Sequence, residues 1–394
     1  TITTITPTLS FLCFEETTTM GNSNNAARHG YTVTYDSDSH WRVLTQMWGS
    51  IWPKVLPYCI FNVAIAASIE YLDKHKNISL AISNEGHTFM NLMVAFLVVS
   101  RVTISMGRYN EARGYLGTMY RECRELIQNM AVLTNHNNDT NAKEWRNNVA
   151  YQMCILLRCS MGVIDYTEHY VNVWELDELD EDEKQEMTQY IYYKTGSGQN
   201  ALRWGHGKRT EYEENMRVPV RLAYILRKEI RKQRKMLSKP LIVPQELKLY
   251  ASVNSFMGGY YGMRKFMTTP FPFPLVQMAR TFLFFYVFTV PFALLSDKSN
   301  AYAHCAIIFV LTFGFMGLET TAIELDNPFG DDENDFDNLG MAQTAFEDTY
   351  LSILDVDGPQ WTDRLRLRMN PKLNRQMHNG IEMYHSERTP LVMI

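Results

Sequence analysis

The chain has 394 residues, of which 46% are hydrophobic, and a formal net charge of −5 at pH 7. This mild negative charge argues against a strongly basic nucleic-acid-binding protein, and the length allows one large domain or two smaller ones. The six cysteines are scattered without a CxxC pair, so we expect reduced thiols in helices rather than a zinc site or a disulfide framework.

The first residues have the composition of a flexible segment. Residues 1–30 are rich in Thr, Ser and Asn and lack the basic-then-apolar layout of a secretory signal. Because the chain starts with Thr rather than Met, we expect it to be truncated or processed. Order is expected to begin near Tyr31, and Trp41, Leu44 and Met47 predict an amphipathic helix over 40–49.

Four runs are long and apolar enough to cross a bilayer, which takes roughly 20 residues. They cover residues 50–72, 86–106, 275–295 and 301–318. The connector between the last two is so short that these helices must run antiparallel. Pro291 should kink the third run, and the TTPFPFP segment at 268–274 should form a rigid hinge before it.

The second apolar run carries large side chains on one face. Phe89, Met93 and Leu97 are spaced four residues apart, which places them on one side of a helix. Such a stripe is most often core packing or lipid contact. It could instead line a narrow constriction if several subunits place this helix at a symmetry axis, and hydrophobic constrictions gate pores by dewetting.

Residues 107–269 form a charged region without a membrane span, and we expect a helical bundle on the cytosolic side. Helices should end or begin at Gly107, Gly114 and Gly117. The apolar piece 151–166 is too short to span and contains charges, so it predicts a buried helix.

Some charged side chains lie within or near the apolar runs, and a basic run lies outside them. Arg280, Glu319 and Glu324 should face the protein interior, because charges in lipid are costly. The basic run 227–239 is either an exposed amphipathic helix or a surface that attracts anions or anionic lipid head groups.

An acidic stretch follows the fourth run at 327–337, with the sequence NPFGDDENDFD. Five carboxylates lie within seven positions, at Asp331, Asp332, Glu333, Asp335 and Asp337. They repel one another unless a cation or a basic partner neutralises them, and oxygen-only ligands suit Ca²⁺. The spacing is not that of an EF-hand, so the stretch is either a solvated acidic loop or a different kind of Ca²⁺ site.

Four segments carry a resemblance to a known family. They are ELDNPFGDDENDFD at 324–337, LVVSRVTISMGRYNEAR at 97–113, PLV at 274–276 and GSI at 49–51. Together they resemble the bestrophins, a family of Ca²⁺-linked and related anion channels, in the style of plant, algal and bacterial members. Residues 125–250 could not be matched position by position.

The resemblance implies an all-α membrane protein with four transmembrane helices and a large cytosolic helical region. It also implies a homopentamer around a central pore that passes chloride and bicarbonate or other small anions. The expected segments are a flexible N-terminus (1–30), an arm with membrane helices 1–2 (31–107), the cytosolic region (108–270), membrane helices 3–4 (271–320), the acidic clasp (321–340) and a C-terminal segment that packs on the cytosolic region or is partly flexible (341–394).

The family's pore neck falls on three positions of the second apolar run. They are Phe89, Met93 and, at the outer mouth, Glu85. A ring of five Glu side chains would oppose anion entry unless they are protonated, paired or turned aside, so Glu85 departs from the expected pattern. A second constriction on the cytosolic side would lie near Ser255 or Phe256.

The family's Ca²⁺ clasp also transfers onto this chain. It implies side-chain ligands from Asp332 and Asp335 and backbone oxygens from Asn327, Asp331 and, in the N-terminal segment, Val33. Whether Ca²⁺ would gate the pore or only stabilise the protein is left open.

The expected partners are copies of the same chain, membrane lipids and small anions, without nucleic acid. The expected location is the plasma membrane or a plastid or thylakoid membrane. We do not expect an enzyme, because His206 near Trp204 and the acidic cluster have no catalytic partner at a recognisable spacing. An anion-coupled carrier and a non-conducting membrane scaffold are the alternatives.

Overall fold

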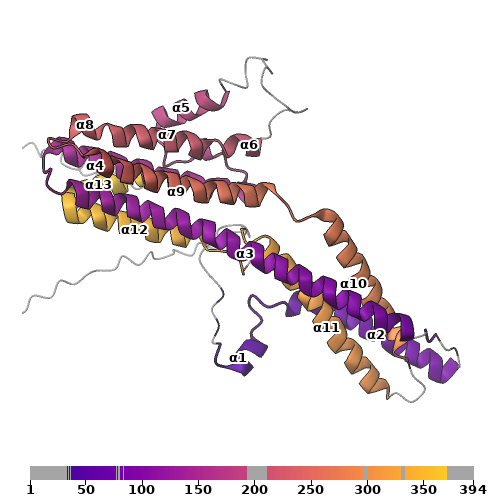
Figure 1. Ribbon diagram of the computed structural model, residues 1–394. Helices are drawn as coiled ribbons and strands as arrows, with labels where there is room; N and C mark the ends of the chain where they lie inside the picture. Colours follow the sequence, from indigo (N-terminus) through magenta and orange to yellow (C-terminus); the bar gives the residue numbers. More distant parts are fainter. Residues whose placement is uncertain are drawn as a thin grey trace, which may run out of the picture.

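The computed structural model describes residues 33, 35, 37–76, 78, 80–82, 84–192, 211–295, 300–329 and 333–370, and the regular elements among them are helices. They are α1 (His40–Thr45), α2 (Trp52–Lys76), α3 (Asn84–Thr134), α4 (Thr140–His169), η1 (Val173–Glu175), α5 (Glu181–Tyr192), α6 (Glu211–Asn215), α7 (Val218–Arg231), α8 (Gln233–Met236), α9 (Val243–Thr268), α10 (Phe273–Ala293), α11 (Ala301–Asp326), α12 (Asn338–Asp357) and α13 (Pro359–Met369). They form two connected bundles (Figure 1).

The membrane bundle consists of α2, the first half of α3, α10 and α11. Within the described ranges, four helices are long and apolar enough to span a membrane, and each overlaps one of the four predicted runs. The ends differ from the prediction mainly at α11, which continues beyond 318 to Asp326. It continues because ion pairs with α2 and α3 stabilise its last turns, and these pairs cannot be recognised from the apolar run alone.

Helix α3 connects the two bundles without a break over 51 residues, a length of about 77 Å (Figure 1). The predicted helix ends at Gly107, Gly114 and Gly117 are therefore wrong. A Cβ at any of these three positions would meet nothing within 4 Å, so the glycines do not face the core. Each costs about 1 kcal/mol of helix propensity, which the buried side chains of the same helix outweigh.

The extramembrane bundle comprises the second half of α3 with α4 to α9, α12 and α13. Its core contains the apolar part of α4, confirming the buried helix predicted at 151–166. Helix α9 runs back along α3, and two glycines allow the close approach. A Cβ on Gly259 would lie 3.0 Å from the Tyr115 backbone oxygen, and one on Gly262 would lie 2.3 Å from the Tyr115 ring.

The polar and proline-rich segments behave as the sequence indicates, with one exception. Four residues separate α9 from α10 at the predicted hinge, and Pro291 lies inside α10, where the kink stays a prediction. The exception is α1, which ends at Thr45 rather than near 49 and buries no residue. So short a helix gains little from packing, and Gly49 then adopts a left-handed backbone conformation, with φ of 69°.

The five described cysteines are free, as expected; they are Cys59, Cys123, Cys154, Cys159 and Cys305. The predictions for residues 1–30 and for His206 with Trp204 lie outside the described residues.

Candidate functional site

Two opposite faces of α3 have different surroundings in the membrane bundle. One face is buried against α2, α10 and α11 and carries Val94, Val98, Arg101 and Ser105 at helical spacing. The opposite face is left uncovered by the other described residues. The helix therefore offers a long apolar surface to something other than its own fold.

The predicted neck residues lie on the uncovered face. Phe89 is 67% exposed, Met93 is 38% exposed, and Glu85 is exposed in the first turn of α3. A carboxylate in the first turn of a helix is stabilised by the partial positive charge of the helix N-terminus. This local effect provides a reason for Glu85 that is independent of any pore.

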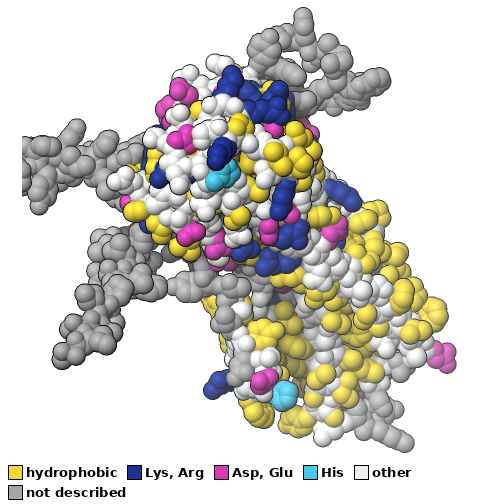
Figure 2. Space-filling model, turned by 60° about the vertical axis from the view of Figure 1, so that its left-hand side comes forward, with side chains coloured by type: hydrophobic (Ala, Val, Ile, Leu, Met, Phe, Trp, Pro, Cys, Tyr) yellow, Lys and Arg dark blue, Asp and Glu magenta, His cyan; other side chains and the backbone are white. Residues whose placement is uncertain are grey.

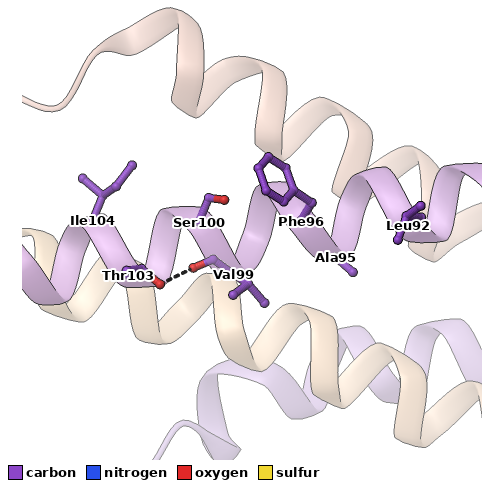
Figure 3. Close-up of a pocket in the computed structure, with 7 residues that line it drawn as sticks. All are labelled: Leu92, Ala95, Phe96, Val99, Ser100, Thr103 and Ile104. Carbon is purple, nitrogen blue, oxygen red and sulfur yellow. Dashed lines mark hydrogen bonds between the residues drawn. The ribbon is translucent and has the colours of Figure 1, made fainter.

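An open groove of about 630 Å³ continues this face further along α3. It is lined by Leu92, Ala95, Phe96, Val99, Ser100, Thr103 and Ile104, all from α3 (Figure 3). Thr103 donates its hydroxyl hydrogen to the backbone oxygen of Val99 at 2.9 Å, so this hydroxyl is satisfied within the helix. The groove is apolar, and hydrophobic side chains also dominate the visible surface of the membrane bundle (Figure 2).

Only part of the predicted Ca²⁺ clasp can be located. Asp331 and Asp332 lie outside the described residues; Asn327 is exposed directly after α11, and Asp335 is half-buried. Within the described ranges, which omit residues 330–332, no three His, Cys, Asp or Glu side chains come together to hold a metal ion. The complete ligand set therefore stays a prediction.

The N-terminal segment does reach the acidic stretch. A Cβ on Gly49 would lie 2.4 Å from Val33 Cγ2 and 3.3 Å from Asn334 Oδ1, so these three residues are neighbours. Asn334 Nδ2 donates to the Gly49 backbone oxygen at 3.2 Å and to Glu324 Oε2 at 3.4 Å. Two distant parts of the chain thus meet here, at the edge of the acidic stretch.

Lys54 and Glu324 were not paired by sequence reasoning, yet they form an ion pair between α2 and α11. One feature of the sequence could have indicated the pair. Lys54 lies at the start of the first apolar run and Glu324 just beyond the end of the fourth, so the two charges lie at the same membrane surface if these runs are antiparallel. Glu324 is 11% exposed, so its predicted inward orientation is confirmed.

Aromatic rings anchor the acidic stretch on the extramembrane bundle. The Phe336 ring lies 5.6 Å from that of Phe329 and 4.6 Å from that of Tyr109 on α3, between ring centroids. Phe329 also contacts Phe266 of α9 at 5.5 Å, and the backbone N–H of Phe336 donates to the Pro328 oxygen at 3.1 Å. The stretch is therefore attached to both α3 and α9.

For two other predicted features, the surroundings favour one of the alternatives left open by the sequence. Phe256 is fully buried in the core of the extramembrane bundle, so it cannot line a constriction, whereas Ser255 beside it is half-buried. The basic run 227–239 covers the end of α7 and α8, at the end of the molecule far from the membrane bundle (Figure 1). This position does not support a role at lipid head groups.

Four helices long and apolar enough to span a membrane, one of which continues into an extramembrane bundle, define an all-α, multi-pass membrane protein. The sequence model described as "Bacterial/Fungal Bestrophin protein" matches residues 32–349. The chain belongs to this bestrophin family. No curated protein matches the sequence.

Solved structures share the fold. A variant of a bacterial bestrophin homologue from Klebsiella pneumoniae has a TM-score of 0.59 and 17% identity, covering 79% of this chain and 100% of its own. A second variant of that homologue gives 0.59 and 16%, with coverage of 79% and 100%. A structure described as a membrane protein gives 0.60 and 17%, with coverage of 78% and 99%.

Proposed function

We propose that this protein is a subunit of an anion-selective channel that passes chloride and bicarbonate or other small anions. The observation that carries the proposal is the uncovered apolar face of α3, on which Phe89 and Met93 are 67% and 38% exposed. A membrane helix with one face in its own bundle and one face free is suited to line a shared pathway. Membership of the bestrophin family supports the same function.

In the proposed assembly, five copies place this face of α3 around a central axis. The rings formed by Phe89 and Met93 would create a narrow apolar neck. Water is excluded from such a neck, so weakly hydrated anions pass more easily than strongly hydrated ones, and a small rotation of α3 can close it. Met93 makes the neck deformable, because its side chain is unbranched.

The proposed Ca²⁺ site would use the side chains of Asp332 and Asp335 and backbone oxygens of Asn327, Asp331 and Val33. The meeting of Val33, Gly49 and Asn334 supports it, because it brings the N-terminal segment to the acidic stretch. Bound Ca²⁺ would remove the repulsion among the carboxylates. The chain's own residues would then hold the end of α11 against the N-terminal segment and bias the arrangement of the helices.

Single-channel recording of the purified protein in planar bilayers tests the function. We expect unitary currents whose reversal potential shifts when chloride is replaced by a larger anion and stays unchanged when the cation is replaced. Reversal potentials that follow the cation gradient, or the absence of unitary currents from correctly folded protein, would overturn the proposal.

A further inference from the structure

A charged cluster lies on the buried side of α3, away from the proposed neck. Arg101 of α3 and Arg280 of α10 share one carboxylate, that of Glu319 on α11. The distance to Glu319 Oε1 is 2.9 Å from Arg101 Nη1 and 2.8 Å from Arg280 Nε. The prediction that Glu319 faces inward is confirmed, since its side chain is only 4% exposed.

A second pair continues the cluster towards the extramembrane bundle. Arg108 Nε of α3 lies 3.4 Å from Asp326 Oδ1 at the end of α11, and both side chains are largely covered. Together the Arg101–Arg280–Glu319 triad and the Arg108–Asp326 pair contain three guanidinium groups and two carboxylates. The cluster therefore carries one positive charge in excess, and its central pair, Arg101 and Glu319, lies buried where solvent screens charges least.

Arg101 is the buried arginine of the triad, and part of its hydrogen-bonding capacity is unused. Its side chain is 3% exposed, and among the described residues its Nε and Nη1 atoms have no acceptor in hydrogen-bonding geometry. The N–H groups of a buried guanidinium normally donate hydrogen bonds, because leaving a buried charged donor without an acceptor is costly. Glu319 Oε2 is also without a donor, so polar atoms of both signs are unsatisfied at the same place.

Arg280 gives this cluster a route to the surface. Its side chain is 43% exposed, so the predicted inward orientation of Arg280 is wrong for much of the side chain, whereas the Glu319 carboxylate beneath it is 4% exposed. An anion that approached Arg280 from outside would meet one exposed guanidinium first and the buried one next. Arginine suits this role, because its planar group binds halides, carboxylates and phosphates while remaining charged.

We infer that Arg101 and Arg280 form a binding site for a small anion, inside the membrane bundle and separate from the apolar face of α3. The anion balances the excess positive charge and accepts hydrogen bonds from the unsatisfied N–H groups of Arg101. Water that enters with it supplies a donor to Glu319 Oε2. The ligand is either a free anion or the phosphate of an anionic lipid, since both present the same chemistry to Arg280.

The test is thermal unfolding of the purified protein at constant ionic strength, with bromide replacing gluconate as the probe. We expect bromide to raise the unfolding temperature in a saturable way. Arg101→Gln and Arg280→Gln each bring the cluster to zero net charge and should weaken bromide binding by about tenfold or more. Glu319→Gln increases the excess charge and should strengthen binding.

Arg121→Gln is the matched control, because Arg121 also lies on α3 but is 62% exposed and pairs with Glu122 outside the cluster. It should leave the bromide response unchanged. The source of the ligand is decided by repeating the measurement in nanodiscs. Bromide stabilisation in pure phosphatidylcholine identifies a free anion, and stabilisation only when phosphatidylglycerol is added identifies a lipid phosphate.

The inference is overturned if neither bromide nor phosphatidylglycerol stabilises the wild-type protein. It is also overturned if Arg101→Gln and Arg280→Gln retain the full response, or if Glu319→Gln weakens it. The readout is stability rather than current, so the outcome does not depend on whether the protein conducts.

Discussion

Lys54 and Glu324 form an ion pair that joins the first turn of α2 to the last turn of α11, and Asn334 donates a hydrogen bond to the same carboxylate at 3.4 Å. Three segments that are distant in sequence are thereby tied at one end of the membrane bundle. Because the acidic stretch begins directly after α11, any change in that stretch acts on this junction.

We expect the Lys54–Glu324 pair to contribute a modest coupling energy. Lys54 is 45% exposed, so solvent screens the pair and about 0.2–1 kcal/mol is expected. A double-mutant cycle with Lys54→Gln and Glu324→Gln, measured by unfolding, gives this value. Strictly additive single effects would show that the pair contributes nothing to the junction.

Adjacent glycines on α9 should respond in opposite ways to the same change. In Gly259→Ala the new methyl group would lie 3.0 Å from the Tyr115 backbone oxygen, so α9 must move away from α3 at a cost of about 1–3 kcal/mol. In Gly258→Ala it would meet nothing within 4 Å, and helix propensity should raise stability by up to about 1 kcal/mol. Unfolding of the two variants is the measurement, and equal effects would contradict the close packing.

The four spans and the hinge could be predicted because they depend on local properties. A run of apolar residues as long as the bilayer is thick, or a segment with alternating prolines, determines its own structure almost regardless of context. The continuity of α3 could not be predicted. Gly107, Gly114 and Gly117 weaken a helix locally, and only tertiary packing of the same helix compensates for them.

The candidate site could be predicted only where a motif carries it. Asn327 and Asp335 are recognisable from the acidic stretch, and the approach of Val33 came from the family resemblance. The pairing of Lys54 with Glu324, and of Arg101 and Arg280 with Glu319, depends on which spans are neighbours. That information is absent from the order of residues along one chain.

A carboxylate of the extramembrane bundle should make stability depend on pH in the acid range. Burial raises the pKa of Glu246, but hydrogen bonds from Arg234 and Tyr250 outweigh it, and the pKa is lowered overall. Because the pKa is lower in the folded state, the ionised carboxylate stabilises the fold at pH values above the pKa of the unfolded chain, which is about 4.3 for Glu. This contribution is lost as the pH falls through the folded pKa.

Glu246→Gln should therefore flatten the decrease of stability below about pH 4.3, as measured by denaturant unfolding at several pH values. Glu181→Gln is the control, because the Glu181 side chain is 81% exposed. An unchanged acid limb in Glu246→Gln would show that other carboxylates dominate acid unfolding.

The apolar neck predicts the effect of shortening its side chains. Replacing Phe89 and Met93 with Ala should widen the constriction and raise single-channel conductance, because the barrier to water and ions falls. Phe285→Ala is the size-matched control, since Phe285 is 58% exposed on α10 rather than α3. Unaltered conductance in the Phe89 and Met93 variant would place the gate elsewhere.

Glu85→Gln should increase anion conductance by removing repulsion at the mouth.

The acidic stretch predicts the response of the current to Ca²⁺. Asp332→Ala combined with Asp335→Ala removes both proposed side-chain ligands, so the Ca²⁺ dependence of the current in planar bilayers should disappear. Asp363→Ala is the control, because Asp363 on α13 is 67% exposed and far from α11 in the chain. If the double variant requires Ca²⁺ to fold but then conducts without responding to it, the ion has a structural role rather than a gating one. A full Ca²⁺ response in the double variant would exclude these carboxylates as ligands.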